Sequence, residues 1–186
     1  IMGLAPYGNP HLKIPNYNKS YIQIFREIIK YKSGLNYKIN LDWITYNYER
    51  DTWLSKKFTK IFGKKRNYNS KINTNHKNIA AALQLRIEEV VIQQLKYLKS
   101  KYKIDKLCIA GGVGLNCSLN GKIQSSKIFK EIFIQPASGD SGLSYGAGLV
   151  TLMKLKKKYK HLKRRSFYLG SRFSNKEIKK VLLKFK

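Results

Sequence analysis

The stretch "LCIAGGVGLNCSLNGKIQ", residues Leu107–Gln124, is the clearest indication of how this chain folds. An apolar run ends at two glycines, Gly111 and Gly112, and a segment of mixed apolar and polar residues follows them. This order is typical of a β-strand, a tight turn and an amphipathic α-helix. The stretch therefore predicts one strand–turn–helix unit, with the strand at 106–110 and the helix at about 115–125.

A second unit of the same kind follows. "EIFIQ", residues 131–135, predicts a strand, and we expect a helix at about 141–159 after the loop "QPASGD". Strands and helices that alternate at these lengths predict parallel strand pairing and an α/β fold. In such sheets the ligand site lies beyond the carboxyl ends of the strands, where both glycine-rich turns fall.

The N-terminal part of the chain predicts shorter elements and one long helix. The pattern at 18–32 predicts a helix with a possible cap at Asn18, and 36–48 suits one or two strands. The clearest helix spans about 78–99, because apolar residues recur there three and four positions apart. A short helix is also expected within 51–66, anchored by the apolar side chains Trp53, Phe58 and Ile61.

The composition favours a globular protein over a disordered, secreted or membrane-spanning one. The 186 residues suit one domain or part of one, and 42% of them are hydrophobic. The two cysteines, Cys108 and Cys117, have neither metal-site nor disulfide-framework spacing. No run approaches the roughly 18 apolar residues of a membrane helix, and no signal peptide is visible. We therefore expect a cytoplasmic protein without a membrane partner, and the start at Ile1 indicates an internal piece of a longer chain.

The formal charge of +28 raises the question of a nucleic-acid partner. The lysines are spread over almost every segment, and the sequence has no zinc-finger spacing, basic zipper region or RNA-binding sheet signature. These features favour a solvated basic surface over a dedicated nucleic-acid face. A basic nucleic-acid-binding protein remains the alternative function.

The first glycine turn does not match the common nucleotide motifs. The dinucleotide fingerprint requires a glycine where this chain has Cys117, and the spacing of a Walker-type phosphate loop is also absent. However, Gly111 and Gly112 lack a Cβ, so a phosphate or sugar could approach their backbone closely. The following helix would point free N–H groups at the same place, and Asn116 offers both a donor and an acceptor. The turn is either a nucleotide contact or a plain strand-to-helix connection.

The second turn, "QPASGDSGLSYGAG" at 135–148, places Asp140 where a helix is expected to begin. An aspartate in that position commonly caps the helix through its side chain. Its carboxylate could instead bind a metal ion at the mouth of the site. Both roles remain open on the residues alone.

Four motifs in fixed order resemble the carbamoyltransferase family of nodulation-factor and antibiotic-modifying enzymes. They are "MGLAPYG" at 2–8, "NIAAALQLRIEEVV" at 78–91, "LCIAGGVGLNCSLNG" at 107–121 and "IFIQPASGDSGLSYGAGL" at 132–149. The resemblance implies an actin-like, ribonuclease-H-like nucleotide-binding subdomain that is incomplete here. It predicts that 1–160 form the C-terminal half of the actin-like domain. Residues 161–186 would then hold a linker and the start of a C-terminal adenylate-forming-type domain.

The resemblance also implies a reaction and its site residues. Members of the family take a carbamoyl group from carbamoyl phosphate, activate it with ATP as carbamoyl-adenylate, and pass it to a hydroxyl of a small molecule or sugar. Carried over to this chain, Gly3, Gly111, Gly112 and Asn116 would contact the nucleotide. Asp140 would bind a divalent metal, iron or magnesium. No catalytic residue is identified.

The chain departs from the family pattern in two ways. Gly114 replaces the usual alanine, which is expected to widen the turn. The family's metal-binding histidine pair is absent, since the only histidines are His11, His76 and His161. We therefore expect a fragment that is inactive alone, and a non-catalytic remnant of the family is a further alternative.

Overall fold

The computed structural model describes residues 1–155 and 170–185. It divides into two compact units, Ile1–Gly139 and Asp140–Lys186. Helices predominate and the strands form two small sheets, so the predicted α/β class is confirmed. The actin-like architecture stays a prediction.

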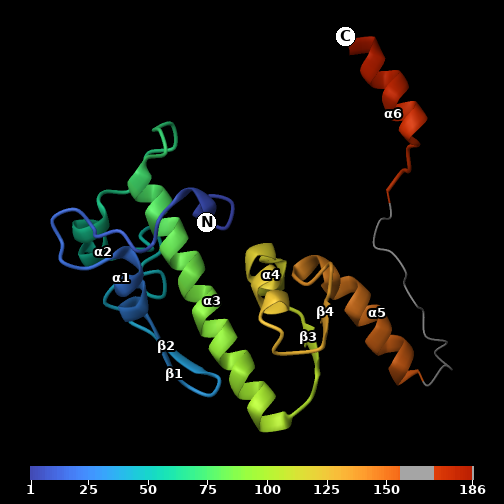
Figure 1. Ribbon diagram of the computed structural model, residues 1–186, viewed down its shortest axis with the longest axis horizontal. Helices are drawn as coiled ribbons and strands as arrows, with labels where there is room; N and C mark the ends of the chain where they lie inside the picture. Colours follow the sequence, from blue (N-terminus) through green and yellow to red (C-terminus); the bar gives the residue numbers. More distant parts are fainter. Residues whose placement is uncertain (156–169, 186) are drawn as a thin grey trace. The chain divides into compact units, whose positions relative to one another are not determined.

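The first unit is built around one long helix, α3 (Thr74–Tyr102) (Figure 1). The side chain of Asn73 accepts a hydrogen bond from the His76 N–H, and the His76 ring accepts one from the Asn73 N–H. This reciprocal cap starts the helix four residues before the predicted position. The helix ends at Lys103, which has a left-handed φ of 55°.

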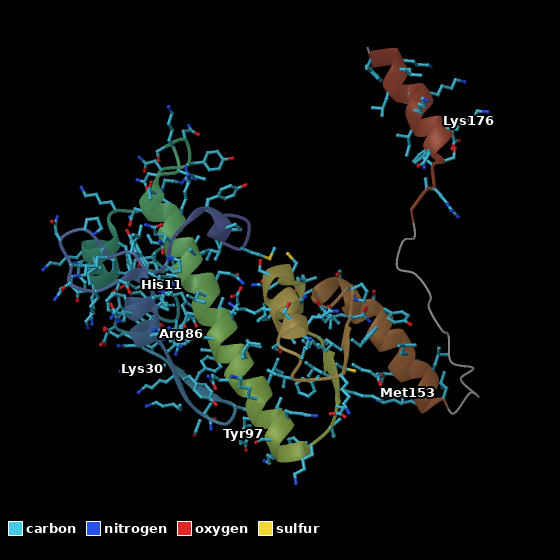
Figure 2. The ribbon with its side chains drawn as sticks, in the orientation of Figure 1. His11, Lys30, Arg86, Tyr97, Met153 and Lys176 are labelled. Carbon is cyan, nitrogen blue, oxygen red and sulfur yellow. The ribbon has the colours of Figure 1, made fainter. Side chains whose placement is uncertain are left out.

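An N-terminal group of elements packs on one side of α3. It consists of α1 (Tyr21–Ile28), the antiparallel strands β1 (Ile29–Ser33) and β2 (Asn36–Ile39), and α2 (Lys56–Phe62), whereas η1 (Ala5–Tyr7) contacts α3 separately. Arg86, labelled in Figure 2, joins α3 to this group by donating from Nε to the Ile29 carbonyl at 2.8 Å. Arg26 on α1 and Arg86 both pair with Glu89. Partial burial favours the neutral acid, but the hydrogen bonds from the two arginines outweigh it and hold the pKa of Glu89 below its ordinary value.

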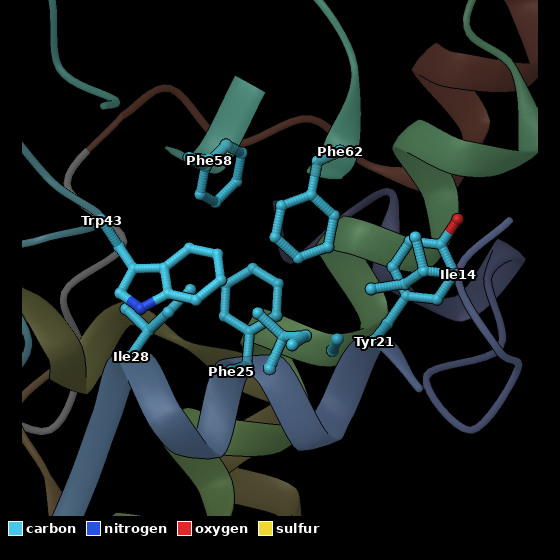
Figure 3. Close-up of a cluster of buried hydrophobic side chains, with 9 residues drawn as sticks. Ile14, Tyr21, Phe25, Ile28, Trp43, Phe58 and Phe62 are labelled. Atoms are coloured by element: carbon cyan, nitrogen blue, oxygen red, sulfur yellow. The ribbon is translucent and has the colours of Figure 1, made fainter. Parts of the chain in front are cut away.

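Aromatic side chains form the core between α1, α2 and α3 (Figure 3). The rings of Phe58 and Phe62 lie 4.4 Å apart between centroids, and Phe25 meets both. Trp43 is 1% exposed and is one of the largest fully buried side chains among the described residues. The predicted anchor Phe58 is therefore confirmed, but Trp53 is 73% exposed and was wrongly placed in the core.

The predicted helix at 18–32 is shorter than expected. Its cap is Ser20, not Asn18, because Ser20 and Gln23 form a reciprocal capping box. The chain then becomes extended at Ile29, which has a φ of −116° and begins β1. Residues 29–32 therefore belong to a hairpin, in which β-branched and aromatic residues are favoured.

The second part of this unit lies on the other side of α3 (Figure 1). Strand β3 (Lys106–Ile109) leads through η2 (Gly112–Leu115) into α4 (Cys117–Ser125), and β4 (Glu131–Ile134) follows. The two strands pair in parallel, as predicted. Leu119 and Ile123 of α4 pack with Leu95 of α3 in a second core cluster.

The second unit contains η3 (Asp140–Gly142), α5 (Leu143–Lys154), α6 (Asn175–Leu182) and η4 (Leu183–Phe185). The predicted linker after residue 160 lies largely outside the described residues. Ser174 caps α6 through a capping box with Glu177. In the described part of the chain, none of the helices combines the length and apolarity needed to cross a bilayer.

Candidate functional site

The turn after β3 exposes bare backbone at two consecutive glycines. Gly111 has a φ of +100°, a conformation that favours glycine, and its N–H donates to the Ser138 carbonyl at 2.7 Å. Both Gly111 and Gly112 are exposed, and a Cβ placed on either would meet no atom within 4 Å. The turn therefore leaves open space at the two residues predicted to contact the nucleotide.

The third glycine of the turn is packed, not open. A Cβ on Gly114 would lie 2.9 Å from the Ser138 hydroxyl oxygen and 3.1 Å from the Ser138 Cβ. The Ser138 hydroxyl is buried and has no hydrogen-bond partner among the described residues. The expectation that glycine at 114 widens the turn is wrong, because the Ser138 side chain occupies the space where an alanine methyl would lie.

Asn116 connects the turn to α4 and to α3. Its Oδ1 accepts the Leu119 N–H at 3.0 Å and caps α4. The amides of Asn116 and Gln84 also hydrogen-bond in both directions, at 2.9 and 3.1 Å. These contacts use one of the two amide N–H donors of Asn116 and leave the other for a ligand.

A buried carboxylate on α3 completes this network. Gln84 and Glu88, one helical turn apart, are only 5% and 8% exposed. Gln84 donates to Oε1 of Glu88 at 2.7 Å, and Lys122 of α4 pairs with Oε2 at 2.8 Å. A buried carboxylate is costly unless it is paired in this way.

Gln84 and Glu88 were not among the predicted site residues. The available signal was their spacing of four positions, which places two polar side chains on one face of a helix whose neighbours are apolar. Their partners could not be read from that spacing. The structure shows that this face meets the cap of α4.

The "MGLAPYG" loop lies beside the same helix terminus. The sulfur atoms of Met2 and Cys117 are 3.5 Å apart, so the loop reaches the first turn of α4. The loop is fixed on α3, because a Cβ on Gly8 would lie 2.1 Å from the Lys77 carbonyl oxygen. Gly3 is exposed with open space around it. Three of the four motifs therefore meet at the N-terminus of α4.

A shallow pocket of about 370 Å³ lies between the loop, α3 and α4. His11 and Gly8 line it from the loop, Gln84 and Glu88 from α3, and Ser118 from α4. The pocket has a carboxylate, an amide, a hydroxyl and an imidazole in its wall. Such a set can hydrogen-bond the polar groups of a small ligand.

Asp140 belongs to the second unit. It is exposed and begins η3, and the N-cap of α5 is Gly142, which offers no side-chain cap. Within the described residues, the Asp140 carboxylate has no hydrogen bond or ion pair, and no three His, Cys, Asp or Glu side chains form a metal cluster. Asp140 thus offers an unpaired carboxylate to a metal, and the described residues contain no complete ligand set.

A comparison with protein families finds that this chain matches one family. The carbamoyltransferase N-terminus family matches residues 1–149. Nodulation protein NolO of Bradyrhizobium diazoefficiens is 31% identical over 155 residues, covering 83% of this chain and 25% of that protein. Nodulation protein NolNO of Sinorhizobium fredii is 33% identical over 150 residues, covering 81% of this chain and 19% of that protein.

An uncharacterized protein of Synechocystis sp. is 32% identical over 189 aligned positions, covering 98% of this chain and 29% of that protein. The chain therefore spans between 19% and 29% of the length of these three relatives. Reactions of the whole proteins do not transfer to it directly.

Proposed function

The chain belongs to the carbamoyltransferase family, and we propose that it forms part of the nucleotide site of an ATP-dependent O-carbamoyltransferase. In the proposed reaction, water takes the phosphoryl group of carbamoyl phosphate, so that inorganic phosphate leaves and carbamate remains. A carbamate oxygen then attacks the α-phosphorus of ATP, the bond to the β-phosphate breaks, pyrophosphate leaves, and carbamoyl-adenylate forms. A hydroxyl oxygen of the acceptor then attacks the carbamoyl carbon, the bond to the phosphate oxygen breaks, and AMP leaves. The acceptor is a hydroxyl-bearing small molecule or sugar, and the reaction takes place in the cytoplasm.

The open backbone at Gly111 and Gly112 is the observation that supports this proposal most. It lies at the carboxyl end of β3 and at the start of η2, which leads into α4, and ligands of α/β sheets bind at this end of the strands. Free N–H groups and the positive end of the α4 dipole favour a phosphate there. The remaining N–H donor of Asn116 and the exposed backbone of Gly3 lie at the same helix terminus, within reach of the adenylate.

The network behind Asn116 has a positioning role in this proposal. Gln84 fixes the orientation of the Asn116 amide, so the free N–H points away from Gln84 and α3. Glu88 holds Gln84 and Lys122 at the same time. Groups held in place before the ligand arrives lose less entropy on binding.

We assign Asp140 as one ligand of a divalent metal, iron or magnesium, with its other ligands outside this chain. Such an ion, when bound, polarises a carbonyl oxygen as a Lewis acid. Two features support the assignment: the carboxylate is exposed, and it does not cap α5. Carboxylate oxygen suits both metals.

The test is to follow the products of ATP in the full-length protein. Carbamoyl phosphate should cause AMP and pyrophosphate to form, and an acceptor hydroxyl should become carbamoylated. Formation of ADP, or AMP formation that does not depend on carbamoyl phosphate, would contradict the proposed reaction. Replacement of Gly112 by valine should abolish AMP formation, because its side chain would fill the open space at the turn.

A further inference from the structure

A second cavity of about 680 Å³ lies on the α2 side of α3, whereas the glycine turn lies on the α4 side. Phe58 and Phe62 of α2 and Ile79 of α3 line it, together with Trp53 and Leu54 from the loop before α2. Its volume falls within the range of about 300–1,000 Å³ that is typical of small-molecule sites. The proposed carbamoyl transfer uses none of these residues.

Trp53 is held beside this cavity by its backbone. The Trp53 carbonyl accepts the Thr45 N–H at 3.1 Å, and Leu54 forms a bridge with Ile44. The indole is nevertheless 73% exposed. An exposed indole next to an apolar cavity offers a large surface that a planar ligand can cover.

Positive groups surround the opening. Lys64 and Lys65 line the cavity and follow the end of α2, and neither has an acidic partner among the described residues. Arg66 also lines it, but its Nη1 is engaged by the carbonyls of Asn67 and Tyr68. The two lysine ammonium groups have no such contact among the described residues and are available to a ligand.

His76 adds a hydrogen-bond donor to the lining. Its Nδ1 accepts the Asn73 N–H at 3.1 Å, so the proton of a neutral ring lies on Nε2. Asp51 is the one acidic residue in the lining, against Lys64, Lys65 and Arg66. The balance of charge at the opening therefore favours an anion.

We propose that this cavity binds a small molecule that combines a planar apolar ring with an anionic group, such as an aryl carboxylate, phosphate or sulfonate. The ring lies against Trp53 and Phe58, and the anionic group meets Lys64 and Lys65. The proposal goes beyond carbamoyl transfer, because the site lies across α3 from the glycine turn and takes its own ligand.

The test uses two naphthalenes of the same shape. Naphthalene-2-sulfonate is the anionic probe and naphthalene-2-sulfonamide is its neutral counterpart, and equilibrium dialysis against the full-length protein measures both affinities. We expect the sulfonate to bind about tenfold more tightly, since an ion pair that excludes water is worth on the order of a tenfold change. Equal affinity of the two probes would overturn the proposal.

Matched variants locate the binding. Combined Lys64→Ala and Lys65→Ala should weaken sulfonate binding about tenfold and leave sulfonamide binding unchanged. The control removes two lysines that face each other on the β1–β2 hairpin, Lys30→Ala with Lys38→Ala (Lys30 is labelled in Figure 2). This control lowers the net charge equally and should leave both affinities unchanged. An equal loss in the two double variants would show that the effect comes from net charge alone and would contradict the proposal.

Trp53→Ala tests the ring contact. The side chain is exposed, so its removal spares the core, and both probes should lose affinity. Unchanged binding of either probe would refute the proposed position of the ring. ATP in excess should not displace the sulfonate; if it does, the probe occupies the nucleotide site and the separate cavity site is wrong.

Discussion

The side-chain amides of Gln84 and Asn116 hydrogen-bond to each other in both directions, although the two residues are 32 positions apart. Gln84 lies in the middle of α3 and Asn116 caps α4. The pair therefore couples the long helix to the helix terminus that follows the glycine turn. A change on α3 should reach the proposed nucleotide site through this contact.

Replacement of Gln84 by alanine tests that coupling. It leaves the buried Glu88 without one donor and Asn116 without its partner, so the free energy of unfolding should fall by roughly 1–3 kcal/mol. Nucleotide affinity should fall as well. Gln93→Ala is the control, because Gln93 is an exposed glutamine on the same helix. Urea denaturation and ATP titration give both readings, and equal effects of the two substitutions would argue against the coupling.

The packing of Gly114 against Ser138 gives a second prediction. Gly114→Ala should lower the free energy of unfolding by about 1–3 kcal/mol, because the new methyl overlaps the Ser138 hydroxyl. Ser138→Ala removes a buried hydroxyl that makes no hydrogen bond among the described residues, so it should be nearly neutral alone. Combined with Gly114→Ala, it should restore part of the loss.

Gly121→Ala is the matched control for that cycle. Gly121 lies inside α4, and a Cβ there meets no atom within 4 Å. Alanine should therefore stabilise this helix by about 0.5–1 kcal/mol. Strictly additive effects of the changes at 114 and 138 in urea denaturation would show that the two side chains do not compete for space.

The local elements could be predicted from the sequence, whereas the contacts between distant residues could not. The turn at Gly111 and Gly112 between a strand and a helix was predicted because glycine and apolar spacing act within a few residues. The partner of Asn116 was not predicted, since a 32-residue separation leaves no local signal. The predicted cap at Asn18 was wrong; the local signal for Ser20 is the glutamine three positions after it, which completes a capping box.

Burial was the least predictable property. Trp43 and Trp53 are both aromatic and lie ten residues apart, yet one is 1% and the other 73% exposed. Hydrophobicity alone does not decide which of two such residues enters the core, because apolar atoms also cover much of a protein surface. The cavity beside Trp53 was missed for the same reason.

The acid stability of the chain should depend on Asp105. Hydrogen bonds from Lys130 and then Lys99 lower the pKa of its carboxyl from 3.8 to about 2. A pKa below the ordinary value means that the pair stabilises the fold above about pH 4 and that this stabilisation is lost as the pH falls towards 2. Urea midpoints measured from about pH 5 down to about pH 2 should fall less steeply in Asp105→Asn than in the wild type.

The control for this pH profile is Asp42→Asn, which removes an exposed carboxylate that has no ion pair among the described residues. Its profile should keep the wild-type slope. At neutral pH, Asp105→Asn should have only a small effect, since exposed ion pairs contribute little. If the urea midpoints of Asp105→Asn and the wild type fall equally with pH, the contacts of Asp105 with Lys130 and Lys99 do not have the proposed role in acid stability.

The metal role of Asp140 is tested by Asp140→Asn in the full-length protein. The change replaces an anionic oxygen with a neutral one. The affinity of the protein for the metal should therefore fall by at least about tenfold. The midpoint of thermal unfolding should not change, because Gly142 and not Asp140 is the N-cap of α5. Elemental analysis and thermal unfolding read the two effects separately, and unchanged metal content would exclude Asp140 as a ligand.

The role of the Gly111–Gly112 turn in nucleotide binding is tested by comparing ATP affinity in Gly112→Ala and Gly121→Ala. Each substitution adds one methyl to open space, so neither should disturb the fold, but only Gly112 lies in the turn proposed to hold the phosphates. We predict at least a roughly tenfold loss of ATP affinity for Gly112→Ala and none for Gly121→Ala. Unchanged ATP affinity in Gly112→Ala, with the protein folded, would contradict the assignment of this turn as the nucleotide site.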